Sequence, residues 1–122
     1  MEDGLDPAWL RPDSELRIAE RRVGHRLVLA AEGEIDLSSV GSLRAAFERC
    51  TAAGVAEVWL DLTGVEFMDS TGLTALLEAR RNGVPQLAVI CPEGPVRRVL
   101  DVAGFDRVVP IYESRSAAQS AR

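Results

Sequence analysis

The sequence has few of the residues from which metal sites and membrane spans are built. It contains one histidine, two cysteines and no CxxC pair, which leaves almost no material for a metal site. No apolar run approaches the roughly 20 residues that a membrane-spanning helix needs. The formal net charge is -5, opposite in sign to that of most nucleic-acid-binding surfaces. We therefore expect no cofactor, no membrane segment and no direct contact with DNA or RNA.

The residues that are present indicate one folded domain. A chain of 122 residues, 47% hydrophobic and 27% charged, is long enough to bury a single core. Cys50 falls in a helical pattern and Cys91 at the end of a strand pattern, so both are interpreted as buried small apolar residues rather than a redox pair. Residues 1–11 are acidic and contain Pro7 instead of a charged-then-apolar signal sequence, which favours a cytoplasmic location.

The chain begins with an arm and a hairpin. Residues 1–13 are polar and interrupted by two prolines, which predicts a flexible N-terminal arm. Strand patterns over residues 16–23 and 27–31 flank Gly24 and His25. This arrangement predicts an antiparallel hairpin with His25 in its turn.

Helix and strand patterns then alternate. Short apolar runs predict strands over residues 55–62, 87–91 and 108–111. Apolar residues at steps of three and four predict three helices, with Ser38 and Ser39 able to cap the first. The buried stripes expected on these helices are Val40, Leu43, Phe47 and Cys50; Leu73, Leu76 and Leu77; and Val96, Val99, Leu100 and Ala103. A hairpin followed by this alternation predicts a single α/β domain over residues 14–112, with a mixed β-sheet packed against helices.

A carboxylate and two hydroxyls gather where the strand pattern of residues 55–62 gives way to a helix pattern. Asp69, Ser70 and Thr71 can each cap the bare amides of a helix's first turn, and Gly72 leaves the backbone uncrowded. From spacing alone, Ser70 is most simply a helix cap.

A second polar corner follows the hairpin, where the sequence reads Gly33-Glu34-Ile35-Asp36. Right-handed crossovers place the ends of neighbouring parallel strands at one edge of the sheet, so we expect Asp36 to lie near Ser70. Taken alone, Asp36 is also explained as a solvated turn carboxylate before a helix.

These motifs, followed downstream by Val102-Ala103-Gly104-Phe105, resemble the STAS domain family and, within it, the bacterial anti-sigma-factor antagonists. The resemblance runs from about Leu16 to Tyr112. It implies that the first Ser of an Asp-Ser-(Ser/Thr)-Gly motif, here Ser70, is phosphorylated by a partner kinase. Thr71 is the second candidate for the modification.

The resemblance also implies partners. An unphosphorylated antagonist binds an anti-sigma factor with serine kinase activity and so releases a sigma factor, and a metal-dependent serine phosphatase reverses the modification. The resemblance places Asp36, Asp69, Thr71 and Gly72 on the binding face, although Asp69 fits a helix cap equally well. Family members carry a closing amphipathic helix where residues 113–122 form a polar tail with little apolar material.

Two other functions are compatible with parts of the sequence. One is a STAS scaffold subunit of a larger sensory or transport assembly. The other is a small enzyme with Ser70 as nucleophile, which would need a base and an oxyanion site. The sole histidine, His25, is predicted in a turn away from Ser70, and no GxSxG motif is present, so we expect no enzymatic activity.

Overall fold

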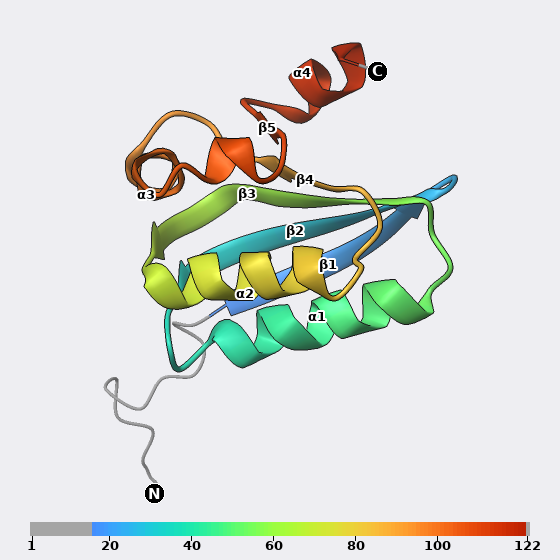
Figure 1. Ribbon diagram of the computed structural model, residues 1–122, viewed down its shortest axis with the longest axis horizontal. Helices are drawn as coiled ribbons and strands as arrows, with labels where there is room; N and C mark the ends of the chain where they lie inside the picture. The colour runs from blue at the N-terminus through green and yellow to red at the C-terminus, as the bar shows by residue number, and fades with distance from the viewer. Residues whose placement is uncertain (1–15, 122) are drawn as a thin grey trace, which may run out of the picture.

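The computed structural model describes residues 16–121; the predicted arm of residues 1–13 lies outside the described residues. A five-stranded sheet has the order β1-β2-β3-β4-β5 (Figure 1). The first two strands form the predicted antiparallel hairpin and the other pairs are parallel, which confirms the α/β class and the mixed sheet. The strands are β1 (Leu16–Val23), β2 (Arg26–Ile35), β3 (Glu57–Met68), β4 (Leu87–Ile90) and β5 (Ile111–Tyr112).

Three helices connect the parallel strands. Because strand order follows chain order from β2 to β5, right-handed crossovers place all three on one face of the sheet. The main apolar core lies between that face and these helices, and a smaller cluster containing Trp59, Ile90 and Ala118 lies on the other face. The helices are α1 (Val40–Ala52), α2 (Ser70–Arg81) and α3 (Pro95–Val102), followed by the 3-10 turn η3 (Phe105–Arg107) and the closing helix α4 (Arg115–Ser120).

Both cysteines belong to the core, as predicted. Cys50 lies on the buried stripe of α1, and Cys91 follows β4. Burial raises the pKa of each thiol to about 11, so both sulfurs stay protonated at neutral pH. Neither takes part in a disulfide.

The strand before the Asp69–Thr71 corner is longer than predicted. β3 continues to Met68, six residues past Leu62, and α2 follows after one residue, at Ser70. Register shifts in the pairing with β2 break the in-out alternation, so that only Val65 and Met68 are buried in this extension. The buried residues of this extension are three positions apart. The sequence therefore shows neither the alternation typical of a half-buried strand nor the continuous apolar run of a fully buried one, and the extension was not predicted.

Some predicted core positions also differ. Leu77 is 42% exposed, because it lies about 100° around the helix from Leu76, and Ala75 and Ala79 complete the buried stripe of α2. Ala103 is exposed as well. The last strand covers only Ile111–Tyr112, since η3 and the turn after it occupy the preceding residues.

The C-terminal segment is helical, although the sequence predicted a polar tail. Ser114 caps α4 by accepting a hydrogen bond from the Ala117 amide at 3.0 Å. Ala118 is buried against the sheet, and Arg115 Nε donates to Asp61 Oδ2 at 2.6 Å. A cap, one small apolar contact and one ion pair therefore hold a helix too short to show an amphipathic pattern.

The Asp61 carboxylate should contribute to stability in a pH-dependent way. Burial acts to raise the pKa of Asp61, but the hydrogen bonds from Thr63 and the pairing with Arg115 outweigh it and hold the pKa below its ordinary value. Asp61→Asn should lower the free energy of unfolding at neutral pH by about 1–2 kcal/mol. Because the folded-state pKa is depressed, this contribution is full above about pH 4 and is lost as the pH falls through the folded-state pKa.

Denaturant unfolding at about pH 7 and at about pH 3 measures this effect, and the gap between parent and variant should shrink at the lower pH. Asp106→Asn is the matched control, because the Asp106 side chain is exposed and has no hydrogen bond or ion pair among residues 16–121. The control should change stability by less than about 0.5 kcal/mol. An undiminished gap in acid would contradict the assignment.

Candidate functional site

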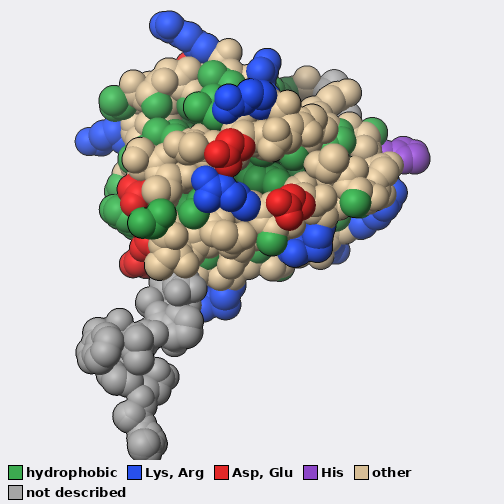
Figure 2. All heavy atoms as spheres, turned by 60° about the horizontal axis from the view of Figure 1, so that its bottom comes forward, with side chains coloured by type: hydrophobic (Ala, Val, Ile, Leu, Met, Phe, Trp, Pro, Cys, Tyr) green, Lys and Arg blue, Asp and Glu red, His purple; other side chains and the backbone are tan. Residues whose placement is uncertain are grey.

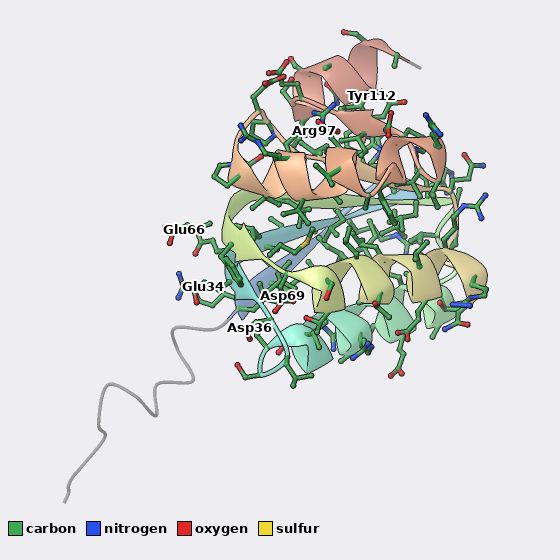
Figure 3. All side chains as sticks on the ribbon, turned by 60° about the vertical axis from the view of Figure 1, so that its left-hand side comes forward. Glu34, Asp36, Glu66, Asp69, Arg97 and Tyr112 are labelled. Carbon is green, nitrogen blue, oxygen red and sulfur yellow. The ribbon has the colours of Figure 1, made fainter. Side chains whose placement is uncertain are left out.

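The carboxyl ends of β2 and β3 bring the two polar corners together. Ile35 pairs with Met68 at the end of the ladder, and the Asp69 amide donates to the Ile35 carbonyl at 3.2 Å. Asp36 and Asp69 therefore lie at the same edge of the sheet (Figure 3). The structure thus places the Asp36 corner beside the start of α2, as the crossover argument predicted.

The Asp36 carboxylate holds the turn that leads into helix α1, and no side chain caps the helix at its N-cap position, Ser39. Its Oδ1 accepts hydrogen bonds from the Ser38 hydroxyl at 2.8 Å, the Ser38 amide at 3.0 Å and the Ser39 amide at 3.2 Å. The hydrogen bond from the Ser38 hydroxyl is the main cause that holds the pKa of Asp36 below its ordinary value, so the carboxylate is charged at neutral pH.

The prediction that Ser38 and Ser39 cap α1 through their side chains is wrong. The buried Ser39 hydroxyl donates to the Glu34 carbonyl at 2.7 Å and accepts from the Asp36 amide at 3.0 Å. It fastens the turn to β2 instead of capping the helix. The corner that carries Asp36 is therefore held by two sets of hydrogen bonds, those of the buried Ser39 hydroxyl and those of the Asp36 carboxylate.

Asp69 caps helix α2, which was one of its two predicted roles. Its Oδ1 accepts from the Thr71 amide at 2.9 Å and from the Thr71 hydroxyl at 2.5 Å. The same bonds engage the Thr71 side chain, which is half-buried. Asp69 and Thr71 are therefore held in one fixed arrangement at the helix start.

Ser70 is not the helix cap. It is the first residue of α2, directly after the cap position. Its side chain is exposed, and its hydroxyl makes no hydrogen bond among the described residues 16–121, whereas its carbonyl accepts from the Thr74 hydroxyl at 3.1 Å. Because Asp69 satisfies the capping role, the Ser70 hydroxyl is available to another molecule.

Gly72 is buried and closely packed, and the backbone there is left uncrowded only because the residue has no Cβ atom. A Cβ atom there would lie 2.5 Å from Met68 Cγ, 2.7 Å from its sulfur and 3.0 Å from Ile35 Cγ2. The glycine lets the first turn of α2 lie directly on the ends of β2 and β3. It supports the site from below rather than from its surface.

An apolar groove opens beside Ser70. It has a volume of about 610 Å³ and lies between the start of α2 and helix α3. Ser70 and Leu73 line one wall, and Arg98, Val99 and Val102 line the other. Of the stripe predicted for α3, Val96 and Leu100 are buried, but the groove depends on how two helices far apart in the chain lie together.

The surroundings of the site carry charge of both signs. The side chains of Glu34, Glu66 and the two aspartates lie at the same end of the sheet (Figure 3). Acidic and arginine side chains are interspersed on the face of α1 and α2 (Figure 2), where Arg44 pairs with Glu78 at 2.9 Å. Within residues 16–121, no group of three or more His, Cys, Asp and Glu side chains is arranged to hold a metal ion. No helix in the same range is long and apolar enough to cross a membrane.

A sheet with three crossover helices on one face, and polar corners at the ends of two parallel strands, is the architecture of a STAS domain. The sequence model of the STAS domain matches residues 17–118, and the chain belongs to this family.

Two curated relatives are similar in sequence. The anti-sigma F factor antagonist of Paenibacillus polymyxa is 29% identical over 72% of this chain and 79% of its own length. BtrV of Bordetella bronchiseptica, a candidate anti-sigma factor antagonist, is 26% identical over 87% of this chain and 94% of its own length.

A solved structure supports the same relationship. The crystal structure of an anti-sigma factor antagonist from Mycobacterium paratuberculosis has a TM-score of 0.82 and 26% identity, and the match covers 91% of this chain and 96% of that one. The similarity therefore extends over nearly the whole of both chains.

Replacing Gly72 should reveal how closely α2 must approach the strands. Gly72→Ala should lower the free energy of unfolding by about 1–3 kcal/mol, because the new Cβ forces the buried Met68 side chain to move. Gly41→Ala is the matched control: it also lies in the first turn of a helix, but a Cβ atom there would meet nothing within 4 Å. The control should leave stability unchanged or raise it by up to about 1 kcal/mol. Equal stabilities of the two variants in denaturant unfolding would refute the packing role.

Proposed function

We propose that this chain is an anti-sigma-factor antagonist whose binding is switched by phosphorylation at Ser70. In the unphosphorylated state it binds an anti-sigma factor with serine kinase activity and so releases a sigma factor. The kinase ends this interaction by transferring phosphate from ATP to the Ser70 hydroxyl, and a metal-dependent serine phosphatase restores it. The chain acts in the cytoplasm as a binding module without catalytic activity of its own.

The free hydroxyl of Ser70 is the observation that carries the proposal. A kinase needs a hydroxyl that is exposed and not already committed to the fold. Ser70 meets both conditions, whereas the Thr71 hydroxyl is held by Asp69 at 2.5 Å. The geometry therefore favours Ser70 over Thr71 as the modified residue.

The electrostatics of the corner explain how the modification would prevent binding. A phosphate adds roughly -1.5 to -2 charge at neutral pH. The new charge would stand beside Asp69 and at the same end of the sheet as Asp36. A partner surface fitted to a neutral hydroxyl would then have to desolvate a dianion among carboxylates, which costs affinity without any refolding.

Exposed apolar side chains around the corner support a protein partner. Leu37 is 79% exposed beside Asp36, Phe67 is 48% exposed on β3, and Val102 is 84% exposed on the groove wall. Large apolar residues in such positions are typical of the centre of a protein interface. We propose that the anti-sigma factor covers these residues together with Asp36 and Asp69.

The position of the sole histidine disfavours an enzymatic role for Ser70. His25 lies in the β1–β2 turn, next to Arg26 at the beginning of β2, whereas the Asp36 corner follows the other end of that strand. A serine nucleophile needs its base within hydrogen-bond reach. The length of β2 separates the two groups.

Phosphate mapping tests the assignment directly. After incubation with the cognate kinase and ATP, mass spectrometry should locate phosphate on Ser70 in the parent chain. Ser70→Ala should abolish the modification, and Thr71→Val should retain it, because the modified hydroxyl is that of Ser70. Phosphate on Thr71 in the parent, or at a site distant from α2, would reject the proposal.

The affinity for the kinase should fall when a negative charge is placed at position 70. Ser70→Asp should bind the kinase at least about tenfold more weakly than Ser70→Ala in titration calorimetry, a difference of about 1.4 kcal/mol. Ser116→Asp adds the same charge at an exposed position on α4, on the other face of the sheet, and should bind like the parent. Equal affinities of the two Ser70 variants would count against the charge effect.

A further inference from the structure

Among the described residues that line the groove beside Ser70, Arg98 carries the one cationic side chain. Pro95, Arg98, Val99 and Val102 follow the helical spacing i, i+3, i+4 and i+7, and together they form the α3 wall of the groove. Ser70 lines the opposite wall. Arg98 and Ser70 thus line the same groove but come from different elements.

Arg98 is uncommitted, in contrast to its neighbour. Arg97 Nε donates to Asp101 at 3.1 Å, and its Nη1 donates to the Cys91 carbonyl at 2.9 Å, so this side chain fastens α3 to the end of β4. Arg98 has no ion pair and no side-chain hydrogen bond among residues 16–121, and it is exposed. A free arginine on an otherwise apolar wall is available to bind an anion.

We propose that Arg98 binds the phosphate carried by Ser70, so that phosphorylation places an ion pair across the mouth of the groove. This inference rests on the proposed modification of Ser70 and adds the residue that receives the phosphate. The paired phosphate and guanidinium cover the apolar lining of Leu73 and Val99. Phosphorylation therefore closes the groove to a partner as well as adding charge to the corner.

The chemistry of arginine suits this role. Its planar guanidinium can present two N–H donors to two phosphate oxygens, and it stays charged at every physiological pH. The carboxylates of Glu34, Asp36, Glu66 and Asp69 also lie at this end of the molecule (Figure 3). They repel the phosphate, which leaves Arg98 as the favourable contact on the groove.

A phosphate titration tests the pairing without kinase or partner. Phosphoserine is incorporated at position 70 during translation, and the second phosphate pKa is read by 31P NMR. An adjacent guanidinium favours the dianion and lowers this pKa, whereas the nearby carboxylates raise it. Arg98→Gln should therefore raise the pKa of the phosphate by about 1 relative to the parent, and Arg98→Lys should give an intermediate value.

Arg80→Gln is the matched control, because Arg80 is exposed near the C-terminal end of α2 and does not line the groove. The control should titrate like the parent. The same phosphate pKa in the parent and in Arg98→Gln would overturn the inference. Failure of the kinase to modify Ser70 would instead refute the proposed function, and the titration would still report whether the ion pair forms.

Discussion

The parallel pairing of β2 with β3 is the constraint on which the site depends. Its last rungs join Ile35 to Met68, and the Asp69 amide closes on the Ile35 carbonyl. The two strands then end at the same level of the sheet, so the turn before α1 and the start of α2 become neighbours. Gly72 allows this approach, because any larger residue would meet Met68 and Ile35. The separation of the two corners is therefore set by backbone hydrogen bonds and close packing rather than by flexible side chains.

An aspartate carboxylate accepts nearby backbone amides at both corners, and one hydroxyl is left free. Asp36 accepts from the Ser38 and Ser39 amides in the turn before α1, and Asp69 accepts from the Thr71 amide in the first turn of α2. Each carboxylate also accepts from a neighbouring hydroxyl, that of Ser38 or Thr71. Only the Ser70 hydroxyl at the start of α2 is left without such a bond among residues 16–121. A modification there can change the surface without removing a hydrogen bond on which the fold relies.

Local patterns predicted the features that local interactions decide. The hairpin, the apolar stripe of α1 and the capping by Asp69 follow from spacing and from the nearest amides. The sequence did not reveal features that depend on distant partners. The Ser39 hydroxyl needs the Glu34 carbonyl, α4 needs the Asp61 carboxylate, and the groove needs α2 beside α3. The sequence pattern indicates only a solvated helix face for Arg98, because the opposite wall of its groove comes from the distant helix α2.

The central claim is that the two corners and the groove form one binding surface that a phosphate on Ser70 switches off. Chemical-shift mapping of the 15N-labelled chain with the unlabelled kinase partner tests it most directly. When the partner is added, we expect the amide signals of residues 36–39, 69–73 and 98–103 to shift together. When the partner is added to the chain that carries phosphate on Ser70, we expect none of these signals to shift. Shifts confined to the opposite face, around Trp59 and α4, or shifts that persist after phosphorylation, would contradict it.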